Sequence, residues 1–176
     1  MQFDAVLRRF SEFFEREGIR YALAGGLAVV AWGSTRGTND ADFVVERANG
    51  PRVRAFAESL GYETTFVSDG YSNHHHADKG FGDVDFMYVT GDTAERVFAA
   101  AARRTAAGLP LPVTSPEHLI AMKVVAMKSK PMRVLIDAPD IAFLLDLPGI
   151  DKAAVKEQFS RHGLLRIFDE LEREKG

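Results

Sequence analysis

Segments with strand-like and helix-like periodicity alternate along the first part of the chain, and this alternation limits the possible folds more than any other feature. Residues 2–17 carry apolar side chains at three- and four-residue spacing, as an amphipathic helix does. Short apolar or alternating runs typical of strands occur at residues 19–24, 40–46, 62–67 and 81–90. Helices are expected at residues 27–32, 51–60 and 92–107, with a hairpin or loop at 68–80. The order predicts an α/β fold (α+β in some schemes), with a small mixed β-sheet flanked by helices.

The chain changes character at the segment Gly108-Leu-Pro-Leu-Pro, after which it is expected to be helical throughout. Ser115, Pro116 and Glu117 form a good helix start, with a hydroxyl at the N-cap, proline at the first helical position and an acid in the first turn. Further helices are expected at residues 116–129, 138–147, 151–160 and 162–174. We therefore expect a core at residues 1–110 and a C-terminal helical segment at 111–176, packed on the core as one compact domain.

Composition excludes several classes of protein. The 176 residues, 46% hydrophobic and 27% charged, are those of one ordinary globular domain. Because there is no cysteine, disulfide scaffolds, iron–sulfur clusters and thiolate zinc sites are excluded. The longest apolar stretch, residues 21–32, is too short to cross a bilayer, and the charged N-terminus is unlike a signal peptide. We expect a cytoplasmic protein without a membrane partner. A net charge of −3 favours no general nucleic-acid binding, although a local basic patch is compatible with it.

Two carboxylates are the first candidates for chemistry. Asp40 and Asp42 alternate on an expected strand, so both project from the same face. Like charges at this spacing repel unless a cation neutralises them, and carboxylates suit Mg²⁺ or Mn²⁺. Asp85 lies in an equally apolar run, and three converging acids could form a two-metal site for phosphoryl transfer. Asp83 is a rival for the third ligand, and a solvated outer face is the competing interpretation of the Asp40 and Asp42 pair alone.

A glycine pair precedes these acids. Gly25 and Gly26 lie between an expected strand and an expected helix. Glycines at such a turn let backbone N–H groups approach a phosphate closely. A phosphate-binding turn followed shortly by a strand with alternating acids is much more specific than either feature alone.

These motifs resemble the DNA polymerase β-type nucleotidyltransferase superfamily. The resemblance is carried by AGGLAVVAWGSTRGTNDADFVV and FGDVDFMYV, and it covers roughly residues 19–147. The pattern Gly-x-x-Arg-x-Thr-x-Asp-x-Asp, from Gly33 to Asp42, is similar to the AbiEii/MenT-type toxin-like branch. The segment HLIAMKVVAMKSKPMRVLIDAPDIAFLL is similar to the lysine-containing helix and following aspartate-containing helix of that branch. The resemblance implies a nucleotidyltransferase fold.

The resemblance also implies residue roles. Asp40, Asp42 and Asp85 would be catalytic and would bind Mg²⁺ or Mn²⁺, and Asp85 would help to activate the acceptor hydroxyl. Lys123 would reach the β- or γ-phosphate, and Asp140, with Asp137 as its rival, would match the later aspartate. The full set of implied nucleotide-binding residues is Gly25, Gly26, Arg36, Thr38, Lys123 and Asp140. One departure concerns Gly26, since many members have at this position a serine whose hydroxyl contacts phosphate.

The implied reaction is transfer of a nucleoside monophosphate from an NTP to an acceptor hydroxyl, with release of pyrophosphate. The branch suggests an RNA acceptor, such as a tRNA 3′ end, and a toxin-like enzyme with a cognate antitoxin. Arg36 and a basic group formed by Lys128, Lys130 and Arg133 are candidates for RNA contacts. A small-molecule acceptor of the antibiotic type, a protein acceptor and a non-catalytic nucleotide-binding partner are the alternatives.

Overall fold

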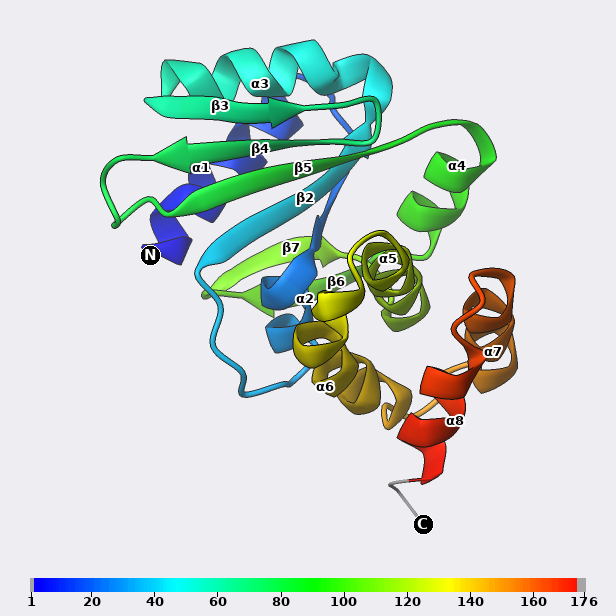
Figure 1. The fold of residues 1–176 in the computed structure, drawn as a ribbon. Helices are drawn as coiled ribbons and strands as arrows, with labels where there is room; N and C mark the ends of the chain where they lie inside the picture. The colour runs from blue at the N-terminus through cyan, green and yellow to red at the C-terminus, as the bar shows by residue number, and fades with distance from the viewer. Residues whose placement is uncertain (1, 174–176) are drawn as a thin grey trace. The chain divides into compact units, whose positions relative to one another are not determined.

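Seven strands form one mixed sheet in this computed structural model, which describes residues 2–173 (Figure 1). The strands are β1 (Tyr21–Ala24), β2 (Asp40–Glu46), β3 (Tyr62–Val67), β4 (Tyr71–His76), β5 (Asp83–Val89), β6 (Ala102–Ala106) and β7 (Leu109–Val113). Their order across the sheet is β3-β4-β5-β2-β1-β7-β6. β2 pairs with β5 and β1 with β7 in parallel, whereas the other neighbours are antiparallel. The expected α/β class with a mixed sheet is confirmed.

Four helices accompany the strands in the first of two compact units, which ends at Thr114. They are α1 (Phe3–Arg16), α2 (Gly25–Ala31), α3 (Gly50–Ser59) and α4 (Gly91–Ala99), with a short 3₁₀ turn η1 (Arg47–Asn49) before α3. The second unit begins at Ser115 and is wholly helical in its described part. It contains α5 (Pro116–Ser129), the 3₁₀ turn η2 (Pro131–Arg133), α6 (Val134–Leu145), α7 (Lys152–Arg161) and α8 (Leu165–Arg173).

An aromatic core fills one face of the sheet. Phe10 and Phe14 of α1 are fully buried and lie 5.6 and 5.3 Å, ring centre to ring centre, from Phe43 of β2. Phe13 stacks on Phe56 of α3 at 3.9 Å, so α1 and α3 cover the same face. The phenylalanines of the first helix therefore point into the core of their own chain. The opposite face of β2 and β5 carries acidic side chains together with apolar ones such as Val44 and Met87.

The expected helix at residues 92–107 is wrong in its second half. α4 ends at Ala99, and a hairpin of β6 and β7 follows. Its two-residue turn, Ala107 and Gly108, has positive φ at both positions (46° and 80°), which is typical of a type I′ turn. The alanine- and arginine-rich sequence favours a helix locally, but pairing of β7 with β1 outweighs that preference. The boundary expected at residue 110 falls inside β7.

The hairpin that was one of the two expectations for residues 68–80 is present, because the segment contains the strand β4, which pairs with β3. One smaller expectation changes. α6 begins at Val134, before the expected residue 138, and has Pro139 in its interior. The proline removes one backbone donor opposite Leu135, whose side chain is 73% exposed, so water can satisfy the freed carbonyl. The other helices and strands match their expected positions within a few residues.

The start of α5 has the expected capping. The Ser115 hydroxyl accepts from the backbone N–H of His118 at 3.4 Å, with Pro116 at the first helical position. Asp151 caps α7 in the same way, accepting from the N–H of Ala154 at 2.9 Å. Across residues 2–173, no helix combines the length and the apolar character needed to span a membrane.

Candidate functional site

Four carboxylates lie on one face of two neighbouring strands. β2 and β5 are parallel, and their register pairs Asp40 with Asp83 and Asp42 with Asp85. Paired residues of adjacent strands share a face, and alternate residues of one strand do so too. The structure therefore brings the three acids expected at the site together on the face opposite the aromatic core, and it adds Asp83 to them. We call this surface the acid face.

The acids of this face make one another harder to ionise. Desolvation is the largest cause that raises the pKa of Asp85, and the charges of Asp40 and Asp83 add to it, while a hydrogen bond from Asn73 opposes it. Desolvation and the charge of Asp83 also raise the pKa of Asp40, against the opposing charge of Arg36. A cation bound among these carboxylates would relieve this repulsion.

Gly25 joins the glycine turn to the acid face. β1 pairs with β2 so that Ala24 lies opposite Asp42, and the chain then turns through Gly25 with φ of 58°. A Cβ atom at Gly25 would overlap the carboxylate of Asp42. Only glycine meets both conditions, because other residues are strained at this φ and have a side chain that the carboxylate excludes.

A side chain at Gly26 would meet two residues of the loop that precedes β2. A Cβ at Gly26 would lie 2.8 Å from Oγ1 of Thr38 and 3.4 Å from Cζ of Arg36. The loop that carries these two residues therefore lies against the turn, and a side chain at Gly26 would require the Thr38 side chain to move. Arg36, Thr38 and the glycine pair, all implied as nucleotide-binding, are neighbours in the structure.

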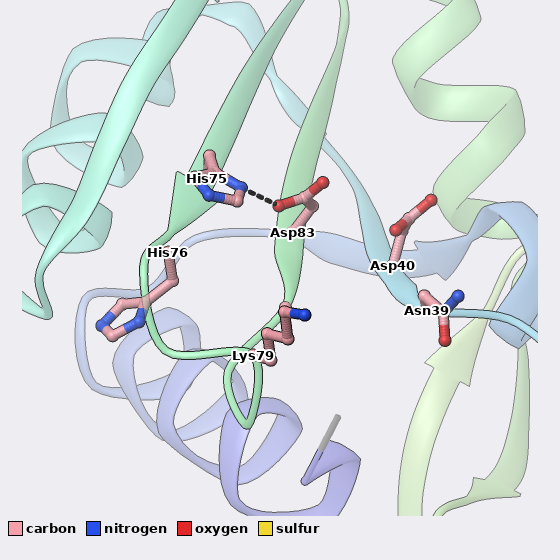
Figure 2. A pocket seen from close by; sticks show the side chains of 7 residues that line it. Asn39, Asp40, His75, His76, Lys79 and Asp83 are labelled. Atoms are coloured by element: carbon pink, nitrogen blue, oxygen red, sulfur yellow. Dashed lines mark hydrogen bonds and ion pairs between the residues drawn. The ribbon is translucent and has the colours of Figure 1, made fainter.

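Two pockets border the acid face. The first, of about 370 Å³, is shown in Figure 2 and is lined by Asn39, Asp40, His75, His76, Lys79, Gly82 and Asp83. The second, of about 310 Å³, is lined by Thr65, Asn73, His74, His75, Asp83 and Asp85. Both pockets combine carboxylates with hydrogen-bonding side chains from β4, and the first also contains Lys79. Such a set suits a polar ligand.

β4 supplies site residues that the sequence reasoning missed. Its register places Asn73 opposite Asp85 and His75 opposite Asp83. Nδ1 of His75 lies 2.7 Å from Oδ1 of Asp83, and the dashed line in Figure 2 marks this contact. The three consecutive histidines alternate, so His75 lies on the acid face whereas His74 is buried on the other. Recognising residues 71–76 as an alternating strand would have found both Asn73 and His75.

The donor set of the acid face fits a hard divalent cation, because Asp40, Asp42 and Asp85 offer carboxylate oxygens from rigid neighbouring strands. As the side chains stand, no three histidine, aspartate or glutamate groups within residues 2–173 are clustered closely enough to hold a metal ion. Binding would therefore require small side-chain rotations toward a shared cation.

Lys123 forms a buried cluster in the helical unit with Asp137 and Asp140, the two candidates for the later aspartate of the resemblance. Nζ of Lys123 lies 2.8 Å from Oδ1 of Asp137 and 2.6 Å from Oδ2 of Asp140. Nε of Arg133 lies 2.8 Å from the other oxygen of Asp137. Burial raises the pKa of Asp137, but hydrogen bonds from Arg133 and Lys123 outweigh it, so the pKa is lowered overall. Lys128 and Lys130 are exposed near the end of α5.

No protein-family model matches the chain, and no curated protein matches it. Solved structures do. The antibiotic-resistance factor ANT(2'')-Ia is similar with a TM-score of 0.60 and 17% identity, over 97% of this chain and 90% of that one. The chain has the nucleotidyltransferase fold. The lincosamide antibiotic adenylyltransferase LnuA, solved with lincomycin, gives a TM-score of 0.59 and 17% identity over 81% of this chain and 96% of that one.

A third structure with the nucleotidyltransferase fold comes from Thermotoga maritima and is described as a putative nucleotidyltransferase. Its TM-score is 0.52 at 13% identity, and the match covers 78% of this chain and 94% of that one. Similarity to three structures at such low identity shows that the fold is shared although little of the sequence is.

Proposed function

We propose that this protein transfers a nucleoside monophosphate from an NTP to the hydroxyl of an RNA acceptor. The observation that supports the proposal most strongly is the register of Asp42 with Asp85 beside the Gly25 turn. It gives two carboxylates on rigid strands, next to the strand-to-helix turn of Gly25 and Gly26. Nucleotidyl transfer needs this combination, because catalysis of phosphoryl transfer is largely positioning and charge stabilisation.

The residues of this chain have separate tasks in the proposed reaction. The Gly25–Gly26 turn would hold the triphosphate, with the Thr38 hydroxyl and the Arg36 guanidinium beside it as further donors. Lys123 is proposed to contact the β- or γ-phosphate. Asp85 would accept the proton of the acceptor hydroxyl.

Asp40, Asp42 and Asp85 are the proposed ligands of Mg²⁺ or Mn²⁺. Such an ion, when bound, supplies charge stabilisation to the oxygens of the transferring phosphoryl group. Burial, with the charges of neighbouring carboxylates added to it, raises the pKa values of Asp40 and Asp85, and a bound cation would offset both effects. An RNA-modifying toxin with a cognate antitoxin is the proposed biological setting, supported by the AbiEii/MenT-type pattern from Gly33 to Asp42.

A small-molecule acceptor is the second candidate function. It is favoured by a specific observation, since two of the similar structures are described as an antibiotic-resistance factor and a lincosamide antibiotic adenylyltransferase. Both candidate functions would use the acid face. They differ in the acceptor that would bind beside Asp85.

Labelling with each of the four α-³²P NTPs in Mg²⁺ or Mn²⁺ tests the proposal. We expect label on total RNA, loss of that label in Asp42→Asn, and retention in Asp4→Asn, a control whose side chain is exposed on α1, the helix that covers the opposite face of the sheet. Label on an aminoglycoside or lincosamide but not on RNA would favour the second candidate. No label on any acceptor with any NTP would contradict nucleotidyl transfer.

A further inference from the structure

We propose that Phe66 and Tyr71, on the β3–β4 hairpin, form a platform on which a base of the RNA acceptor stacks during the reaction. The inference rests on the proposed function and adds the position of the acceptor to it. It begins from the order of the strands and is supported by an exposed pair of aromatic rings.

The order of the strands separates the two substrates. In nucleotidyl transfer the attacking and leaving oxygens lie roughly in line on opposite sides of the phosphorus. The Gly25 turn, proposed to hold the leaving pyrophosphate, is at the end of β1, on one side of the β2 and β5 acids. The acceptor must then approach from the other side, over β4 and β3. Asp85, the proposed proton acceptor, is on β5. Its register partner Asn73 is on β4, the next strand on that side.

Two exposed aromatic rings lie on that side of the acid face. Phe66 and Tyr71 are 46% and 42% exposed, and they are the two aromatic residues in the exposed class within residues 2–173. Their rings stack with centroids 5.0 Å apart and planes at 22°. Register places Phe66 opposite Asn73 and Tyr71 opposite Met87, so both belong to the same face as Asp85. The fold gains little stability from burial of these partly exposed rings, and the rings are available to stack on a flat ligand.

Polar groups connect the platform to the acids. Thr65 and Asn73 line the pocket of about 310 Å³ that also contains Asp85. Tyr71 is two residues before Asn73 on β4, which corresponds to roughly 7 Å along a strand. A hydroxyl and an amide at this position can pair with the edges of an unstacked base. One nucleotide stacked on the rings would therefore place its neighbour within reach of Asp85.

A nucleobase is the occupant that this surface favours. Single-stranded RNA is recognised by stacking of splayed bases on aromatic side chains together with hydrogen bonds to base edges, and both elements are present here. A second copy of the chain would pair with the edge strand β3 through backbone hydrogen bonds. Such pairing would not require the two rings to lie on the same face as the acids. The base of the NTP is disfavoured as the occupant, because the Gly25–Gly26 turn proposed to hold its triphosphate is on the opposite side of β2.

The test uses the full-length protein and a single-stranded RNA of about 12 nucleotides, labelled with fluorescein at its 5′ end. The double variant Phe66→Thr with Tyr71→Thr removes both rings and keeps strand propensity. Fluorescence anisotropy should show affinity lowered about 5- to 150-fold, the range for loss of one base stack. Val67→Thr is the matched control, since Val67 is 48% exposed on the same strand but faces the other way. It should bind like the wild type, as should the ring-retaining variant Phe66→Tyr with Tyr71→Phe.

A second RNA, identical in length but abasic at its last three positions, separates stacking from phosphate contacts. It should bind the wild type and the double variant equally. The platform is overturned if the double variant binds intact RNA as the wild type does while RNA labelling continues, a result that leaves the proposed function standing. Weaker NTP binding with unchanged RNA binding would overturn it in favour of the NTP base. Absence of both RNA binding and RNA labelling in the wild type would remove the acceptor class itself.

Discussion

Gly25 and Gly26 are adjacent, but different neighbours require each of them to be glycine. Gly25 has a positive φ and lies against the Asp42 carboxylate, whereas Gly26 has ordinary dihedrals and is crowded by Thr38. Substitutions at the two positions should therefore fail for different reasons. Gly26→Ser, the residue found in many members of the superfamily, would require movement of the Thr38 side chain before it could fit.

Gly25→Ala should lower the free energy of unfolding by about 1–3 kcal/mol from backbone strain, with a further loss from displacement of Asp42. Urea denaturation would measure the change. Gly37→Ala is the matched control, because no atom lies within 4 Å of its added Cβ and its φ is not in the left-handed region. Equal effects of the two substitutions would mean that the contact between Gly25 and Asp42 does not restrict the turn.

Asp85→Asn should stabilise the protein in metal-free buffer at pH 7 and lower kcat by about 10²–10⁴-fold if Asp85 is the proton acceptor. The raised pKa means that the native state binds the proton more tightly than the unfolded state. Wild-type stability from this group therefore increases as pH falls through its folded pKa, and the asparagine variant lacks that increase.

Asp83→Asn is the comparison that separates the two rivals for the third ligand. It removes the negative charge beside His75 but leaves Asp85 in place. Thermal melts and steady-state kinetics of both variants give the answer. A larger loss of kcat in Asp83→Asn than in Asp85→Asn would assign the role to Asp83.

At the scale of elements, the β3–β4 hairpin is fixed to the core by a buried polar chain. His74 is 1% exposed, with Nε2 2.9 Å from the Ser72 hydroxyl and Nδ1 3.1 Å from the Thr64 hydroxyl. Ser72 continues the chain to the hydroxyl of Tyr88 at 2.6 Å. Burial lowers the pKa of His74 to about 4, so this histidine stays neutral near neutral pH.

The hairpin should therefore lose stability in mild acid. The unfolded chain binds a proton at His74 near its ordinary pKa of about 6.5, whereas the folded chain does so near 4, so stability falls as pH drops between these values. The loss is at most about 3 kcal/mol. Urea denaturation of His74→Gln from pH 7 to pH 4 should show a smaller loss than the wild type. Equal losses of stability in the two proteins over this range would mean that His74 does not cause the acid sensitivity.

In the helical unit, Lys123 of α5 forms buried ion pairs with Asp137 and Asp140 of α6. Lys123→Ala would leave Asp137 and Asp140 buried without that partner, at an expected cost of about 3–5 kcal/mol in unfolding free energy. Lys128→Ala, on the exposed side of the same helix, should change stability by less than about 0.5 kcal/mol. Circular dichroism melts would compare them. If Lys123→Ala folds as well as the wild type but binds NTP more weakly, the lysine serves the triphosphate and not the helices.

For the whole molecule, the net charge of −3 means that RNA binding depends on a few local cations. Three or four phosphate contacts give a log–log salt slope of about −2 to −4. Replacing Lys128 and Lys130 together with alanine should flatten the slope by about 1.4, at 0.7 per phosphate on single-stranded RNA. Arg133 is left unchanged because it pairs with buried Asp137. Affinity that does not change between about 50 and 200 mM salt would contradict RNA phosphate contacts.

Sequence patterns within a short window predicted the elements whose structure depends mainly on residues near in sequence. Alternation identified β2 at its observed bounds, and the Ser115-Pro116 cap identified the start of α5. The β6–β7 hairpin was missed because its strands are stabilised by a partner, β1, that is distant in sequence. The acids were found as a set, but their register and the contribution of β4 depend on long-range pairing that no local window contains.

The parallel pairing of β2 with β5 has a consequence for how such a protein can diversify. Everything between Glu46 and Asp83, including the hairpin that carries Phe66 and Tyr71, lies outside the ladder that holds the acids in register. Insertions or deletions at the Ser68–Gly70 turn would change the length and chemistry of the hairpin tip and leave the pairing of Asp42 with Asp85 untouched. Descendants of one ancestral gene could thus exchange one acceptor for another while inheriting the same reaction, with lineage-specific differences concentrated in that single turn.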